Sequence, residues 1–219
     1  MSEFLHKEYP KSFERNDFWS QIKRTVNGQP VSKDQIDMIV TKVSNELELA
    51  NQDTLLDLGC GNGALGNYFL KDIKYYVGVD FSEYLIGIAN EYFQDKEKTL
   101  YVVDDMLSYI QKDNNLINYS KVLIYGCISY LKLNQSYILL KGIRENIQSV
   151  EKIFIGNIPD LEFANKFYSN RNIREFDVND PKSLIGVWWD KNILEEKFYK
   201  MGFDTKITKM PTEFYCSEY

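Results

Sequence analysis

Apolar residues recur along this chain at two spacings, one typical of helices and one typical of buried strands. Ile36, Val43 and Leu47 share a helical face after Ser32, a favoured helix-capping residue, and predict a helix that ends near Ala50. Short apolar runs bounded by turn residues follow, and their length favours buried strands. The predicted strands are 54–58, 75–79, 100–103, 121–125 and 152–155.

Helical patterns separate these strands. They lie at 64–71, 82–93, 106–111 and 136–147. A chain that alternates strands with helices forms a parallel sheet, and the crossover connections place helices on both faces of it. The sequence therefore predicts an α/β fold with a Rossmann-like, doubly wound sheet.

Two segments lie outside this alternation of strands and helices, one before it and one after it. Residues 1–50 combine an aromatic and polar N-terminal cap with the first helix, and a turn signal at 27–30 separates the two. Residues 157–187 are longer than a usual connection, rich in Asn, Asp and aromatic residues, and contain Pro159 and Pro181. This composition predicts an inserted lid.

The C-terminal part, residues 188–219, predicts a helix followed by an antiparallel hairpin. A helical pattern ends at Gly202, and two short strand patterns flank Pro211. Residues 51–156, which hold the five predicted strands, form the expected core. We therefore expect a single domain over 1–219, with a sheet of about seven strands that are mostly parallel.

Composition and charge narrow the classes of partner and compartment. Of 219 residues, 44% are hydrophobic and 26% are charged, as in an ordinary globular protein. The formal net charge of -6 is a poor match to polyanions, so we expect no nucleic-acid partner. The three cysteines show no paired spacing, and the N-terminal residues hold no apolar run for export or membrane insertion. We expect a cytoplasmic protein without a membrane partner, and the oligomeric state stays open.

A glycine cluster directly after the first strand is the strongest local signal. Glycine is needed where a ligand lies against the backbone, because a Cβ would hold the ligand away. Gly59, Gly61 and Gly63 recur at every second position. Gly61, Gly63 and Gly66 also satisfy a GxGxxG spacing, with Asp80 nineteen residues after Gly61. A dinucleotide cofactor is therefore one open interpretation.

The residues around this cluster resemble the motifs of class I S-adenosylmethionine (SAM)-dependent methyltransferases. The first motif, D-x-G-x-G-x-G, runs from Asp57 to Gly63. Its acid suits the ammonium of a methionine group and repels a pyrophosphate. Asp80 ends the second strand directly before Phe81 and a helix, and it resembles the acid of the second motif. A carboxylate there accepts hydrogen bonds from both ribose hydroxyls.

The third motif follows the strand at 100–103. Asp105 and Met106 align with the pair that binds adenine, and Asp104 is the one-residue alternative for the acid. The resemblance covers roughly residues 50–160 and implies SAM as the cofactor. The cofactor residues that it implies in the core are Asp57, Gly59, Cys60, Gly61, Gly63, Asp80, Phe81, Asp104, Asp105, Met106 and Gly126.

Residues 18–28 resemble the arm that folds over the cofactor in several small-molecule methyltransferases. Trp19 and Arg24 are the candidate cofactor residues of this arm. A guanidinium binds a carboxylate through two hydrogen bonds, so Arg24 can pair with the methionine carboxylate. The alternative for Arg24 is a solvated position on the surface of the cap.

The segment after the fourth strand, 125–131, contains no Asp and no [Asn/Asp]-Pro-Pro-[Tyr/Phe] motif. The first absence argues against a catechol-type metal site, so we expect no metal, and the second argues against amino-methylation of DNA bases. No motif selects a catalytic residue, and Tyr130 and His6 are the candidates. Cys60 and Cys127 suit small buried positions.

Methyl transfer from a sulfonium is a displacement that depends mainly on alignment. The resemblance implies a methyltransferase with a small-molecule acceptor, and we expect O-methylation of a sugar or a related metabolite. The cap and Trp188-Trp189 also resemble methyltransferases encoded with surface-polysaccharide enzymes, including those linked to capsular phosphoramidate. The alternatives are a SAM-binding, methyltransferase-like protein without turnover and an NAD(P)-dependent oxidoreductase.

Overall fold

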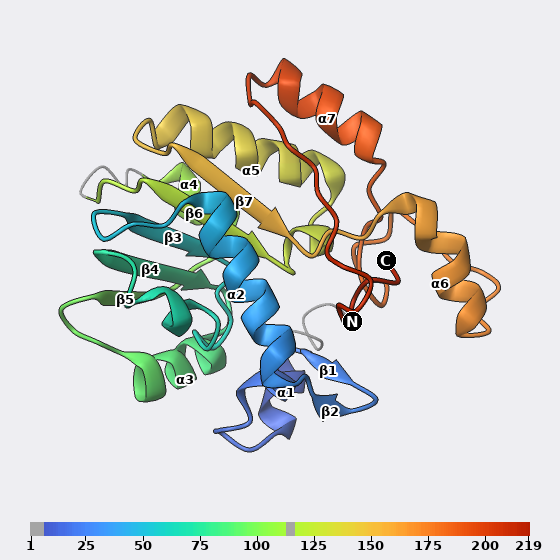
Figure 1. Cartoon of the computed structure of the whole chain (residues 1–219), viewed down its shortest axis with the longest axis horizontal. Helices are drawn as coiled ribbons and strands as arrows, with labels where there is room; N and C mark the ends of the chain where they lie inside the picture. The colour runs from blue at the N-terminus through green and yellow to red at the C-terminus, as the bar shows by residue number, and fades with distance from the viewer. Residues whose placement is uncertain (1–6, 113–116) are drawn as a thin grey trace.

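Five parallel strands form the central sheet of the computed structural model, which describes residues 7–112 and 117–219. Their spatial order is β5-β4-β3-β6-β7, as Figure 1 shows. Every neighbouring pair in this sheet is parallel. The strands are β3 (Thr54–Leu58), β4 (Tyr75–Asp80), β5 (Thr99–Val103), β6 (Lys121–Tyr125) and β7 (Lys152–Gly156).

The direction in which the chain crosses the sheet reverses between β3 and β6. From β3 the chain moves outward through β4 to β5, and it then returns to β6 and continues outward to β7. The connections that follow β3 and β6 therefore leave the sheet in opposite directions and open a crevice. In open α/β sheets, ligands bind in this crevice at the carboxyl ends of the strands.

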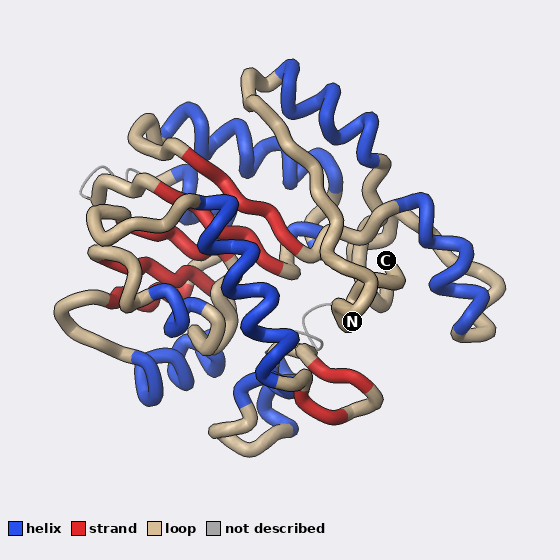
Figure 2. Tube along the Cα trace, in the orientation of Figure 1, coloured by secondary structure: helices blue, strands red, loops and turns tan. Residues whose placement is uncertain are grey.

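Helices cover both faces of the sheet, as the sequence predicts. Leu55 and Leu123 belong to a core cluster with residues of α2 and α3. Leu56 and Val122 belong to a second cluster with residues of α4, α5 and α7. Neighbouring residues of a strand point to opposite faces, so one sheet supports both clusters. Figure 2 shows the strands between the two helical layers.

The helices fall into α-helices and short 3-10 turns. The α-helices are α1 (Phe18–Gln21), α2 (Lys33–Leu47), α3 (Glu83–Phe93), α4 (Met106–Gln111), α5 (Leu133–Asn146), α6 (Ala164–Asn170) and α7 (Lys191–Lys200). The 3-10 turns are η2 (Tyr9–Ser12), η3 (Gly66–Phe69), η4 (Ile128–Tyr130) and η5 (Leu161–Phe163). No helix among the described residues has the length and apolar character needed to cross a membrane.

All five predicted strands are confirmed, but the predicted helix over 64–71 is wrong. Only the 3-10 turn η3 forms there. A side chain at Gly66 would meet the ring of Tyr76, with its Cβ 2.2 Å from the Tyr76 hydroxyl oxygen. The segment therefore packs closely on β4, and tight bonds such as Tyr68 N to Leu65 O replace a full helical turn.

The predicted C-terminal hairpin is also wrong. The described residues after α7 contain no strand, and the sheet has five strands instead of about seven. Backbone N–H groups of Phe214, Ser217 and Tyr219 each bond the carbonyl three residues earlier, which closes consecutive turns. Phe214 and Cys216 are buried in the cluster that includes α2. Burial of these two side chains favours a curled segment over an extended hairpin.

The N-terminal cap contains α1 and a small hairpin. Its strands β1 (Thr25–Val26) and β2 (Gln29–Pro30) pair antiparallel. Asn27 and Gly28 connect them with φ of 50° and 76°. Two consecutive left-handed residues are typical of a tight hairpin turn, so the predicted turn at 27–30 is confirmed. The sequence predicts a helical cap, and this pair of strands is a feature that it does not predict.

The segment after β7 projects beyond the carboxyl ends of the strands (Figure 1). It holds η5 and α6, and it has a small apolar cluster of its own that includes Phe167 and Trp188. The last residue, Tyr219, packs on Phe167 with ring centroids 5.4 Å apart. Arg171 also pairs with Glu218. The end of the chain therefore fastens this insertion to the rest of the molecule.

Candidate cofactor site

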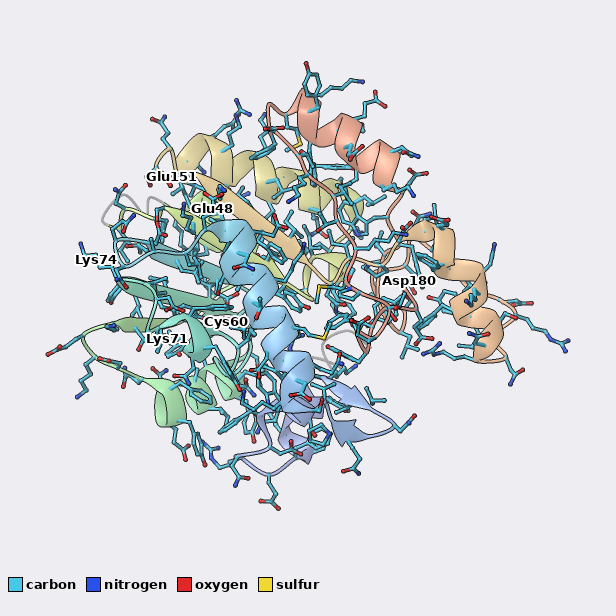
Figure 3. The ribbon with its side chains drawn as sticks, in the orientation of Figure 1. Glu48, Cys60, Lys71, Lys74, Glu151 and Asp180 are labelled. Atoms are coloured by element: carbon cyan, nitrogen blue, oxygen red, sulfur yellow. The ribbon has the colours of Figure 1, made fainter. Side chains whose placement is uncertain are left out.

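The predicted site residues of the core gather at one edge of the sheet. Asp57 lies near the carboxyl end of β3, and Asp80 is the last residue of β4. Figure 3 shows Cys60 near the middle of the molecule, whereas Lys74 and Glu151 lie at the opposite edge, where β4 and β7 begin. The residues that the motifs single out therefore lie at the crevice where the strand order reverses.

The glycine loop has a shape that side chains would disrupt. Gly59 has φ of 80°, and a Cβ there would lie 2.6 Å from the Cys127 sulfur. Gly61 has φ of 58°, and its Cβ would lie 2.9 Å from Ile22. The N–H groups of Gly59 and Cys60 both donate to Val79 O, which ties the loop to β4. The loop is therefore packed closely against the protein's own side chains at positions where only glycine fits.

Asp57 is a buried carboxylate beneath this loop. The Tyr76 hydroxyl donates to its Oδ2 at 2.7 Å. The pKa of Asp57 is raised to about 7: burial is the main cause, the Tyr76 hydrogen bond and the Arg24 charge oppose the rise, and nearby Asp80 adds a smaller contribution to it. An acid of this kind gains strongly from a cation placed beside it.

Asp80 organises the turn between β4 and α3. Its Oδ2 accepts from Gly61 N at 3.0 Å and its Oδ1 accepts from Ser82 N at 2.9 Å. Burial raises the pKa of Asp80, and these two N–H donors oppose the rise. Each carboxylate oxygen has a second lone pair, so Asp80 can hold the loop and accept ligand hydroxyls together.

The two acids after β5 have separate partners. Asp105 caps α4, because its Oδ1 accepts from Leu107 N and Ser108 N. Asp104 pairs with Lys112. Met106 reaches the glycine loop, where its Cε lies 3.5 Å from the Cβ position of Gly59. The helix cap uses only Oδ1 of Asp105, and the assignment of Asp105 to the adenine amine stays a prediction.

Phe81 stands at the outer side of the same crevice. Its side chain is 37% exposed although it is a large apolar residue. The Lys7 ammonium lies 5.6 Å from its ring centroid. The N-terminal cap therefore reaches both the glycine loop, through Ile22, and the neighbourhood of Phe81.

Asn62, which the motif comparison leaves out, fastens the cap to the glycine loop. It is fully buried, and its Nδ2 donates to Phe18 O and to Gln21 Oε1, both at 2.8 Å. Its Oδ1 accepts from Ala64 N at 3.3 Å. The variable position between Gly61 and Gly63 thus bonds a segment more than 40 residues away. The only sequence signal was a polar amide inside an otherwise small and apolar loop.

Arg24 enters the site from the cap. Its side chain is buried, and its guanidinium lies 4.5 Å from the ring centroid of Tyr125, at the end of β6. Nη1 donates to the Tyr215 hydroxyl at 3.5 Å. Nε is buried and has no partner among them. The solvated alternative for Arg24 is therefore wrong, because the cap folds it inward.

The loops after β6 and β7 complete this edge. Gly126 has φ of 71°, and its Cβ position lies 3.4 Å from Asn157 Nδ2 and 3.9 Å from Arg24 Nη2. Asn157 itself has φ of 59°, a left-handed conformation that is uncommon outside glycine. The side-chain amide of Asn157 and the buried guanidinium of Arg24 therefore face the same glycine.

The remaining predicted residues fall around this centre. Trp19 packs on Tyr68 with ring centroids 6.4 Å apart, which gives it a packing contact in the cap. Tyr130 donates to Leu184 O at 3.4 Å, and burial raises the pKa of Tyr130 to about 12. Cys127 donates to Leu58 O at 3.2 Å, and burial raises the pKa of its thiol. His6 lies outside the described residues.

A cavity of about 800 Å³ begins beside this edge. It runs along the outer side of β7 beneath residues 202–210, and its wall includes Tyr125 and Asn157. The wall does not include Asp57, Asp80 or the glycines of the loop. The cavity is therefore a neighbour of the cofactor crevice and is separate from it. Among the described residues, no group of three or more His, Cys, Asp or Glu side chains could hold a metal.

The segment that forms this edge of the sheet matches a known protein family. The family model of a methyltransferase domain matches residues 55–148. The chain is 35% identical over 75 residues to uncharacterized methyltransferase C70.08c of Schizosaccharomyces pombe, which covers 34% of this chain and 27% of that protein. A relative from Invertebrate iridescent virus 6 that carries a methyltransferase name is 28% identical over 113 residues, 51% of this chain and 39% of that protein. The chain therefore matches well under half the length of these curated relatives.

Solved structures agree on the fold. Magnesium protoporphyrin IX methyltransferase from Synechocystis PCC 6803 with bound S-adenosylhomocysteine (SAH) has a TM-score of 0.64 at 14% identity, covering 98% of this chain and 93% of that chain. The small RNA methyltransferase HEN1 has a TM-score of 0.58 at 17% identity, covering 79% of this chain and 21% of that chain. The matched residues 55–148 hold β3 to β6 with the glycine loop between them. Residues 55–148 therefore match a methyltransferase domain, and the chain has the fold of a SAM-dependent methyltransferase that was crystallised with SAH.

Proposed function

We propose that this protein transfers a methyl group from SAM to an oxygen atom of a small molecule, such as a sugar or a related metabolite. The cavity beside the cofactor crevice carries this proposal. Its volume of about 800 Å³ is in the range of small-molecule sites, and it begins at Asn157, next to Gly126 and Arg24. The net charge of -6 opposes a polyanionic acceptor such as RNA.

The residues at the strand ends fit SAM. A buried guanidinium without an ion pair among the described residues is costly, so Arg24 suits the methionine carboxylate. Asp57 suits the ammonium, because burial has raised its pKa and a cation would stabilise the charged form. Asp80 accepts from the ribose hydroxyls and Asp105 from the adenine amine, by the alignment of the second and third motifs.

SAM supplies an electrophilic methyl group when it is bound. The protein's contribution is then to bind, to align and to exclude water. The cap places Ile22 over Gly61 and Arg24 beside Gly126, which closes the crevice from above. Tyr130 keeps its proton at neutral pH because burial raises its pKa, and its hydroxyl already donates to Leu184 O, so in this proposal it orients an acceptor by accepting a hydrogen bond from it.

Aromatic side chains in the cavity support a sugar acceptor. Trp189 and Phe163 line the cavity, and the buried Nε1 of Trp189 has no hydrogen-bond partner among the described residues. Flat aromatic rings in a cavity wall suit the apolar face of a sugar. Acceptors from surface-polysaccharide or capsular phosphoramidate synthesis are the narrower form of this proposal.

Release of SAH in the presence of acceptor panels tests the proposal. We expect release with SAM and one class of sugar, nucleotide sugar or related metabolite, and no release with RNA oligonucleotides. Asp80→Ala serves as the control for enzyme-dependent turnover. Release with RNA alone would contradict the small-molecule acceptor. SAM binding without release across the whole panel would favour the non-catalytic alternative.

A further inference from the structure

The C-terminal segment contributes a residue to the cofactor site that no motif marks. Tyr215 lies more than 190 residues from Arg24 in sequence, yet its hydroxyl accepts a hydrogen bond from Arg24 Nη1 at 3.5 Å. Arg24 is 7% exposed and Tyr125 stacks on its guanidinium. The guanidinium is therefore held between the end of β6 and the last residues of the chain.

Tyr215 is itself fixed in place by α2. The Tyr215 N–H donates to Gln35 Oε1 at 2.8 Å, and Gln35 Nε2 donates to Glu213 O at 3.1 Å. The neighbours Phe214 and Cys216 are buried in the core. One side chain of α2 thus bonds the tail on both sides of Phe214, which limits the positions that the Tyr215 hydroxyl can take.

A neutral phenol is a useful partner for this cation. It orients the guanidinium through one N–H and leaves the positive charge uncompensated, whereas a carboxylate would neutralise the charge. Burial raises the pKa of Tyr215 to about 12, so the hydroxyl stays neutral. Nε of Arg24 is buried without a partner among the described residues, and Nη2 lies 3.9 Å from the Cβ position of Gly126, on the side of the glycine at the end of β6.

We propose that Tyr215 is a positioning residue that orients Arg24 toward the carboxylate of the bound cofactor. This inference rests on the proposed role of Arg24. It assigns to the C-terminal segment a share in cofactor selectivity, because the carboxylate is the group that the aligned guanidinium recognises. The same segment contacts the insertion through Glu218 and Tyr219, so the tail touches both the cap and the insertion.

Calorimetry with two ligands isolates this role. SAM and decarboxylated SAM share the sulfonium, the amine and the adenosine, and they differ in the carboxylate. The ratio of their affinities in the wild type reports the carboxylate contact. We expect Arg24→Ala to bring this ratio close to one, and Tyr215→Phe to lower it about three- to tenfold.

The role of Tyr215 is decided by which of the two affinities, for SAM or for decarboxylated SAM, its substitution changes. Tyr215→Phe should weaken SAM and leave decarboxylated SAM unchanged, because the phenol acts only through Arg24. Gln35→Ala should give the same selective loss without altering the ring. Tyr199→Phe, on the 78% exposed Tyr199 of α7, is the matched control and should leave both ligands unchanged.

Two results would overturn the inference. An equal loss for both ligands in Tyr215→Phe would mean that the ring only supports packing. An unchanged ratio in Tyr215→Phe beside a lost ratio in Arg24→Ala would mean that Arg24 needs no positioning. A failure of the proposed function would give other results than these two. The wild type would then bind neither ligand, or Arg24→Ala would keep the wild-type ratio of the affinities for SAM and decarboxylated SAM.

Discussion

Asp80 tests the assignment of the ribose end at the scale of one residue. Asp80→Ala should weaken SAM binding by about 1.5–3 kcal/mol, the range of hydrogen bonds to a charged group. Calorimetry measures the change, and thermal unfolding reports whether the turn at Gly61 and Ser82 survives. Asp72→Ala, in the loop before β4, is the matched control and should bind normally. An unchanged affinity in Asp80→Ala would place the ribose elsewhere.

Asp57 gives the cofactor-free protein a distinct pH dependence. Burial raises its folded-state pKa to about 7, above the ordinary value of about 3.9. The protonated form is therefore favoured on folding, and the stability from Asp57 is full below about pH 4 and is lost as pH rises through about 7. Relative to Asp57→Asn, the melting temperature of the wild type should fall across this window. A constant difference between the two proteins would contradict a buried, raised Asp57.

The same carboxylate should couple SAM binding to proton release. The ammonium of SAM favours ionised Asp57, so the affinity should decrease as pH falls from about 7 to about 5.5. Calorimetry in buffers with different ionisation enthalpies counts the released proton. Asp57→Asn should bind more weakly and lose this dependence. Equal pH profiles for wild type and variant would separate Asp57 from the ammonium.

The sequence predicts the residues that carry motifs and misses those that join distant segments. Asp57 and Asp80 could be assigned because each ends a strand beside the glycine loop. Asn62, Tyr76 and Tyr215 could not, because their importance comes from contacts across the fold. A polar side chain in a loop or a tyrosine in a strand has no pattern that reveals its eventual partner.

The N-terminal cap is the element that we expect to close the crevice. Deletion of residues 1–30 removes Arg24 and the contacts of Phe18 and Gln21 with Asn62. It leaves the sheet and α2, so circular dichroism should show a folded protein. SAM affinity should drop, since the methionine end loses its cation. Full affinity in the folded truncation would give the cap a structural or acceptor role, and loss of folding would assign its aromatic residues to the core.

Elements could be predicted where local pattern and tertiary packing agree. The central strands β3, β4 and β6 are buried on both faces, and their continuous apolar runs indicate this burial. Residues 64–71 and the C-terminal tail have helical or strand patterns as well, but close packing on Tyr76 and burial of Phe214 and Cys216 override them. These outcomes depend on neighbours that only the fold supplies.

At the scale of the whole molecule, segments from both ends of the chain meet at one edge of the sheet. The cap contributes Arg24, the core contributes Asp57 and Asp80, and the tail contributes Tyr215. The insertion is held beside them through Tyr219. The family match covers residues 55–148, so the cap, the insertion and the tail lie outside the matched segment.

A crystal structure with bound SAH tests this arrangement most directly. We predict that the ribose hydroxyls lie within hydrogen-bonding distance of Asp80 and that the carboxylate pairs with Arg24, with Tyr215 still bonded to Nη1. The cavity along β7 should remain open to an acceptor. SAH bound in that cavity, or in the crevice with Arg24 turned away from its carboxylate, would contradict the account.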